Sequence, residues 1–200
     1  MSSFEELTDD KLYHSYLRGE TSAYDHLMIR YGDSLVMYLY GYLRDFHEAE
    51  DLMIEAFARI MAKRPSIRSG NFKAYLFRTG RNLALRFNER SRRQAFSLDG
   101  MDRDVADNFI AANVHAKAES RAIPQKIADS ERNEALRLCL DRIEPELRES
   151  LWLVYVEGLS YAEAASVMGV KERRIDRLLA KGKQSMRDEL MKEGVTNTYE

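Results

Sequence analysis

The chain has 200 residues, of which 44% are hydrophobic, enough to bury the cores of one or two small globular domains. Its 31 Lys and Arg nearly balance 33 Asp and Glu, so the net charge of −2 does not decide whether it binds nucleic acid. No apolar run approaches the ~20 residues of a membrane span, and the acidic start lacks the pattern of a signal peptide. We therefore expect a cytoplasmic protein with no membrane span of its own.

Helical periodicity runs through the first half of the chain. Apolar residues recur at spacings of three and four over Leu27 to Leu39, Ala49 to Ile60 and Leu76 to Phe87. Pro65 and Gly70 indicate a loop between the last two of these segments. These patterns predict a bundle of about four helices.

Charge is sorted along the chain. Residues 1–58 carry 4 basic and 12 acidic side chains, whereas residues 59–93 carry 11 basic and 1 acidic, and residues 171–192 carry 8 basic and 4 acidic. Two basic segments in an otherwise acidic chain suit two separate contacts with a polyanion. Two solvated helix faces would give the same counts, so charge alone leaves both interpretations open.

Between the basic segments the periodicity fades. Residues 94–130 form a polar stretch that is too long for an ordinary connection within one domain, and we interpret it as a flexible linker with a transient helix around 111–121. The prediction is an all-α protein with one helical domain at 1–93, a second at 131–192 and a tail at 193–200.

The second domain contains the signature of a helix-turn-helix. Pro145 suits the first turn of a helix, whose inner face would include Leu147, Leu151, Val154 and Tyr155 before Gly158 ends it. Ser160 and Glu163 then form a capping box for a short helix over Tyr161 to Met168, and Gly169 supplies the tight turn.

A last helix from about Lys171 would be amphipathic. Its apolar face is expected to bury Ile175, Leu178, Leu179, Gly182 and Met186. A turn of 100° per residue places the opposite set outward: Arg173, Arg177, Ala180, Lys181 and Gln184, with Arg174 on one flank and Asp176 on the other. A basic helix of this kind fits the major groove of DNA, and Arg173, Arg174, Arg177 and Lys181 are the candidate contacts.

The first basic segment predicts a different kind of binding surface. Arg78 and Arg81 lie opposite its apolar face, while Tyr75, Asn82 and Arg86 follow one flank. Aromatic, amide and guanidinium groups beside a polar loop suit single-stranded or melted nucleic acid, because unstacked bases can lie on their planes. For Phe72 we prefer a core position, and for Tyr75 the core and the nucleic-acid interpretation stay open.

Three carboxylates share one helix in the acidic segment. Glu48, Asp51 and Glu55 are expected to be exposed beside its apolar face, where they could bind a metal or a basic partner. No His or Cys completes a transition-metal site, since His47 stands alone, and neither a catalytic triad pattern nor a phosphate loop occurs. We expect a docking surface, no cofactor and no enzymatic activity.

Two stretches together resemble the extracytoplasmic-function group of bacterial sigma factors. The first combines HEAEDLMIEAFARI with FKAYLFRTGRNLA, and the second is IEPELRESLWLVYVEGLSYAEAASVMGVKERRIDRLLAKGKQSM. The resemblance covers nearly the whole chain, and two matches in the right order are more specific than either alone.

The resemblance implies a promoter-recognition subunit. The helix with Glu48, Asp51 and Glu55 would dock on the clamp helices of the RNA polymerase largest subunit, the 63–93 region would melt and hold the minus-ten element, and the helix from Lys171 would read the minus-thirty-five element. The linker would thread toward the RNA exit path. The family also implies an anti-sigma factor as a partner.

The chain departs from the family pattern in its last helix. Lys171 and Arg174 stand where small polar residues and Thr are usual, and Asp176 stands where a basic residue is common. A stand-alone helix-turn-helix regulator is the alternative, because GLSYAEAASVMGV also resembles such modules. A metal-dependent enzyme built on the three carboxylates ranks below both.

Overall fold

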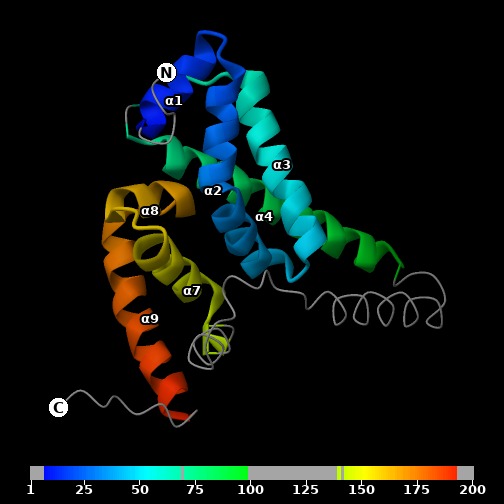
Figure 1. Cartoon of the computed structure of the whole chain (residues 1–200). Helices are drawn as coiled ribbons and strands as arrows, with labels where there is room; N and C mark the ends of the chain where they lie inside the picture. Colours follow the sequence, from blue (N-terminus) through cyan, green and yellow to red (C-terminus); the bar gives the residue numbers. More distant parts are fainter. Residues whose placement is uncertain (1–6, 69, 99–138, 141, 193–200) are drawn as a thin grey trace. The chain divides into compact units, whose positions relative to one another are not determined.

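The computed structural model describes residues 7–68, 70–98, 139–140 and 142–192, and the chain divides into two compact units, Met1–Ser120 and Arg121–Glu200 (Figure 1). Throughout these described residues, all regular secondary structure is helical, as predicted.

The predicted linker is described only at its start. Residues 94–98 continue the last helix of the N-terminal unit, whereas the rest of the linker, with the helix expected at 111–121, and the tail at 193–200 lie outside the described residues. The domain boundaries at 93 and 131 therefore stay predictions.

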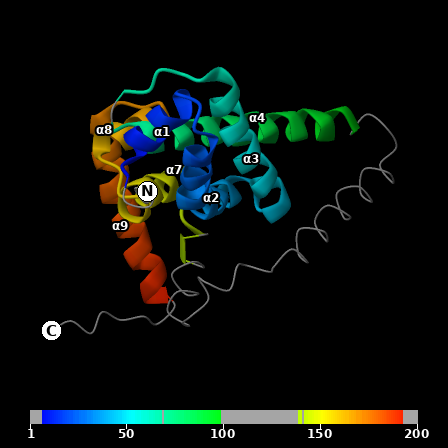
Figure 2. The ribbon, with the colours of Figure 1, turned by 45° about the horizontal axis from the view of Figure 1, so that its top comes forward.

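The N-terminal unit consists of four described helices, α1 (Asp9–Leu17), α2 (Thr21–Leu43), α3 (Phe46–Lys63) and α4 (Phe72–Leu98). The long α2 packs against the other three, an arrangement that both ribbon views show (Figures 1 and 2). The predicted inner faces are confirmed, because the following side chains are buried: Leu27, Leu35, Leu39, Ala49, Leu52, Ala56, Ile60, Leu76 and Leu83.

Three tyrosine hydroxyls connect α1 and α2 to the end of α3. Tyr24 donates to the carbonyl of Phe57 at 2.6 Å, Tyr16 to that of Met61 at 2.9 Å, and Tyr13 to that of Pro65 at 2.8 Å. The acceptors are four residues apart, so the three bonds follow one line along α3 and into the loop after it. Burial raises the pKa of Tyr13 to about 12 and also raises the pKa of Tyr24.

A glycine sets the spacing between α2 and α4. A Cβ atom at Gly80 would lie 3.0 Å from Cδ1 of Leu35 and 3.4 Å from Cδ2 of Leu39. The absence of a side chain at Gly80 therefore lets the two helices approach closely.

The described helices of the C-terminal unit are α7 (Pro145–Leu151), the π-helix η3 (Trp152–Val156), α8 (Tyr161–Met168) and α9 (Glu172–Lys192). Both α7 and α8 pack against α9. Their shared core buries Leu147, Leu151, Leu153, Ile175, Leu178 and Leu179.

The predicted helix up to Gly158 is regular only in its first part. It changes to π geometry at Trp152, whose Nε1–H donates to Oε1 of the buried Glu157 at 2.9 Å. The wider turn carries Tyr155 out of the inner face, where the sequence placed it, and leaves it 53% exposed.

The helix-turn-helix forms with the predicted boundaries. The Ser160 N–H donates to Oε2 of Glu163 at 2.8 Å, and the Glu163 N–H donates to Oγ of Ser160 at 3.3 Å, which completes the capping box. Gly169 ends α8 in the left-handed region at φ 69°, where a glycine is unstrained.

Candidate nucleic-acid interface

The last helix presents a basic face opposite its buried one. Arg173, Arg177 and Lys181 are all exposed and stand four residues apart, whereas Ile175 and Gly182 face the core. We call Arg173, Arg177 and Lys181 the α9 basic stripe. Its exposure agrees with the prediction.

Arg174 has a partner within its own unit. Its Nη2 lies 2.7 Å from one carboxylate oxygen of Glu146 and 2.8 Å from the other, so it links the start of α9 to the first turn of α7. Both side chains are about half exposed, and such pairs contribute little to stability. The sequence marked Arg174 as a nucleic-acid contact and could not reveal a partner 28 residues away.

The fourth helix carries a second polar face. Arg78, Asn82 and Arg86 are exposed at spacings of four and therefore share one side of α4, whereas Arg81 and Tyr75 are half-buried. Phe72 is a core residue, as expected. The half-burial of Tyr75 is compatible with both interpretations of that residue.

The loop between α3 and α4 adds two cations that the sequence did not single out. Arg64 and Arg68 are exposed there, on either side of Pro65. The available signal was the stretch KRPSIR, in which a proline breaks a basic run at a helix end. The loop and the exposed face of α4 together offer guanidinium groups and an amide to a strand of nucleic acid.

The three carboxylates of α3 differ in their surroundings. Asp51 is exposed as expected, whereas Glu48 and Glu55 are only partly exposed, and Glu55 pairs with Arg59 at 2.5 Å. Ile54, which the sequence did not mark, is 54% exposed beside them. An apolar side chain within an acidic surface suits a protein partner that has both basic and apolar groups. Among the described residues, no group of three or more His, Cys, Asp or Glu is arranged to hold a metal ion.

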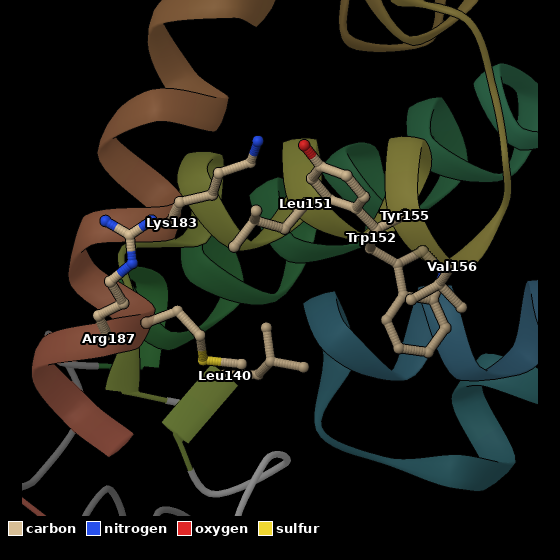
Figure 3. A pocket seen from close by; sticks show the side chains of 8 residues that line it. Leu140, Leu151, Trp152, Tyr155, Val156, Lys183 and Arg187 are labelled. Atoms are coloured by element: carbon tan, nitrogen blue, oxygen red, sulfur yellow. The ribbon is translucent and has the colours of Figure 1, made fainter. Parts of the chain in front are cut away.

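An apolar pocket of about 420 Å³ opens between α7 with η3 and α9 (Figure 3). It is lined by Leu140, Leu151, Trp152, Tyr155, Val156, Lys183, Met186 and Arg187. The Nζ of Lys183 lies 5.0 Å from the centre of the Tyr155 ring, at a distance typical of a cation–π contact. Nothing in the sequence indicated this pocket, because it depends on the π turn that exposes Tyr155 and Val156.

In the part of the chain that the structure describes, no helix combines the length and apolar character that a membrane crossing needs.

Two family models match the chain in the order of its two units. The model for sigma-70 region 2 matches residues 27–94, and the model for sigma-70 region 4 matches residues 133–186. Helix α1 precedes both matched segments.

Curated relatives match across both units. The chain is 29% identical over 170 residues to the ECF RNA polymerase sigma factor SigE of Mycolicibacterium smegmatis, which covers 85% of the chain and 62% of the relative. It is 30% identical over 162 residues to the ECF RNA polymerase sigma factor BldN of Streptomyces coelicolor, which covers 80% of the chain and 57% of the relative. The chain thus spans about three fifths of the length of these two relatives.

A solved structure has the same fold. The sigma factor RpoE of Bartonella quintana, determined in complex with the anti-sigma factor NepR, aligns with a TM-score of 0.65 at 21% identity, over 84% of this chain and 96% of that one.

Proposed function

The chain belongs to the extracytoplasmic-function group of sigma factors, and from that membership we propose that it binds core RNA polymerase and directs it to specific promoters. It would act as a binding subunit in the cytoplasm and not as an enzyme. The observation that carries the proposal is the α9 basic stripe, which a helix-turn-helix with a capped first helix exposes to solvent in a chain that also matches region 2.

Each unit would have its own role. Helix α9 would lie in the major groove of the minus-thirty-five element, with Arg173 and Arg177 reaching guanine edges and Lys181 nearer the phosphates. The loop after α3 and the polar residues of α4, namely Tyr75, Arg78, Arg81, Asn82 and Arg86, would hold the opened strand of the minus-ten element. Glu48, Asp51 and Glu55 would dock on the polymerase, with Ile54 as an apolar anchor.

Two further partners follow from the same membership. Promoter DNA is the first. The second is an anti-sigma factor, a proposal supported by the complex of the structurally similar RpoE with NepR. The exposed apolar groups around Tyr155 and Val156 offer a surface of the kind that protein partners cover.

The alternative, a stand-alone helix-turn-helix regulator, is not favoured, because residues 27–94 match sigma-70 region 2, which a stand-alone regulator would not need.

Transcription in vitro with core polymerase, with and without this chain, tests the proposal. We expect promoter-dependent transcripts only when the chain is present. Selection from a library randomised at the minus-thirty-five element then tests the stripe. Arg173→Ala or Arg177→Ala should lose roughly 1–3 kcal/mol of binding and relax the preference at one position. Lys181→Ala should weaken all elements alike and lower the salt slope by about one.

Lys192→Ala is the matched control, since it removes one positive charge from the same helix outside the stripe, where Lys192 pairs with Glu189 at 2.6 Å. Base preferences that stay unchanged in all three stripe variants would show that α9 is a solvated face and not a reader of sequence.

A further inference from the structure

Helix α1 contacts the end of α3 and the loop that follows it at three successive points. Tyr16 donates to the carbonyl of Met61 in the last turn of α3, Tyr13 donates to the carbonyl of Pro65, and the Gly70 N–H donates to the Asp10 carboxylate, 2.9 Å from each oxygen. The contacts thus fall in the last turn of α3, at the second residue of the connection between α3 and α4, and near the end of that connection. Pro65 and Gly70 lie between the two helices, so the helix hydrogen bonds of α3 and α4 do not fix their positions.

The loop also begins with a strained residue that α1 supports. Arg64 ends α3 in the left-handed region at φ 44°, a conformation that side chains other than glycine rarely adopt. Its guanidinium carbon lies 5.2 Å from the centre of the Tyr16 ring, and its N–H donates to the carbonyl of Ile60 at 2.9 Å. The aromatic contact from α1 therefore favours the turn that directs the chain out of α3.

The loop that α1 holds exposes side chains of the kind that bind nucleic acid. Arg64, Ser66, Arg68 and Gly70 are exposed, and the loop leads into α4, whose exposed face begins at Arg78. A loop that receives an unstacked base must present its donors at fixed positions, because base contacts are short and directional. A mobile loop would lose binding energy to ordering on each encounter.

We propose that α1 is a positioning element that holds the α3–α4 loop in the conformation that receives an unstacked base of the opened promoter, with Asp10 and Tyr13 as its positioning residues. This inference rests on the proposed function, since it assigns the loop to the melted strand. It goes beyond that function because α1 lies before both segments that the family models match.

Two matched pairs of variants separate positioning from stability. Tyr13→Phe removes the hydroxyl bond to the loop, and Tyr24→Phe removes a bond of the same kind that ends within α3, at Phe57. Asp10→Ala removes the acceptor of the Gly70 N–H, whereas Asp10→Asn removes the same charge and keeps one acceptor oxygen. Within each pair both variants remove the same kind of hydroxyl or the same charge, and one of them leaves the hydrogen bond to the loop in place.

The experiment uses full-length protein with core polymerase on a promoter selected from a library randomised at the minus-ten element. Strand opening is followed by the fluorescence of 2-aminopurine placed in that element. We expect Tyr13→Phe and Asp10→Ala to open the duplex about fivefold more slowly and to relax the minus-ten base preference, while Tyr24→Phe and Asp10→Asn stay close to the unchanged protein. A template whose minus-ten element is already unpaired needs no strand opening. On such a template the two variants of each pair should differ less in the rate at which the open complex forms.

Equal losses for Tyr13→Phe and Tyr24→Phe, or for Asp10→Ala and Asp10→Asn, would overturn the inference, because stability or charge would then account for the effect. Unchanged opening in all four variants would also overturn it. A failure of the proposed function looks different, since the unchanged protein itself would then give no promoter-dependent transcript.

Discussion

Helices α3 and α8 both end in a left-handed residue next to a proposed DNA contact, but they reach that conformation by different means. At the end of α8 the residue is Gly169, at φ 69°, and nothing lies within 4 Å of the position its Cβ would take. At the end of α3 the residue is Arg64, at φ 44°, with its guanidinium over the Tyr16 ring. The turn at Gly169 is stable because of its own residue type. The turn at Arg64 depends on helix α1, which lies 45 to 60 residues away in sequence.

The same difference, between long-range contacts and local caps, distinguishes the N-terminal unit from the C-terminal unit as a whole. The N-terminal unit joins its helices through tyrosine hydroxyls and contacts between aromatic rings, while the helix-turn-helix of the C-terminal unit is defined by a capping box and a glycine. Contacts between distant segments are lost together when a unit opens, whereas local caps act on one helix each. The two units should therefore respond to different perturbations.

Alkaline pH should give the largest difference in stability between the two units, because it should destabilise the N-terminal unit much more than the C-terminal one. The pKa of Tyr13 is raised by burial to about 12, and the pKa values of Tyr24 and Tyr31 are raised as well, chiefly by burial. Unfolded tyrosine ionises near pH 10, so the contribution of these hydroxyls is fully present below pH 10 and is lost as the pH rises toward 12. The described tyrosines of the C-terminal unit, Tyr155 and Tyr161, are exposed.

Urea unfolding at pH 9 and pH 11 measures this difference. Far-UV circular dichroism follows both units, and the emission wavelength of Trp152, the only tryptophan, follows the C-terminal one. We expect the transition of the N-terminal unit to move to lower urea at pH 11 and that of Trp152 to move much less. A shift of equal size in both transitions would contradict the expectation.

Gly169→Ala should have the next largest effect, in the C-terminal unit alone. An L-residue at this φ costs about 1–2 kcal/mol, and no new contact offsets that cost, because the added Cβ meets nothing within 4 Å. The Trp152 transition in urea should move to lower concentration by the corresponding amount. Gly169→Asn is the control, since asparagine tolerates the left-handed region, and equal losses for the two variants would rule out backbone strain as the cause.

Arg64→Gly should have the smallest effect. It relieves the strain of a left-handed arginine, about 1–2 kcal/mol, but it removes the contact with Tyr16 and adds the chain entropy that glycine loses on folding, about 0.5–1 kcal/mol each. These terms nearly cancel, so the net change should stay within about 0.5 kcal/mol. Arg64→Ala keeps the strain and loses the contact, so it should cost about 0.5–1 kcal/mol. The N-terminal transition in circular dichroism measures both. A strongly stabilising glycine would mean that Tyr16 does not hold the turn.

The same contrast explains which features could be predicted from the sequence. The bounds of α8 were predicted correctly because Ser160, Glu163 and Gly169 act within a few residues of one another. The exposure of Arg173, Arg177 and Lys181 followed from helical periodicity alone. Such features need no knowledge of what lies across the fold.

Most of the missed features depend on residues far apart in sequence. The pairing of Arg174 with Glu146 joins two helices, and the acceptors of Tyr13 and Tyr16 lie on another helix and its loop. The π turn at Trp152 comes with a bond to the buried Glu157, and no periodicity indicates it. Such positions are set by packing and not by local preference.

The close approach of α2 and α4 at Gly80 limits which substitutions this sequence can accept during evolution. A methyl group at position 80 would meet Leu35 at 3.0 Å, and a core filled in this way resists added volume. Position 80 can therefore gain a side chain only if position 35 becomes smaller at nearly the same time, and position 35 has little room to grow. Among homologues, the two positions should vary as a pair.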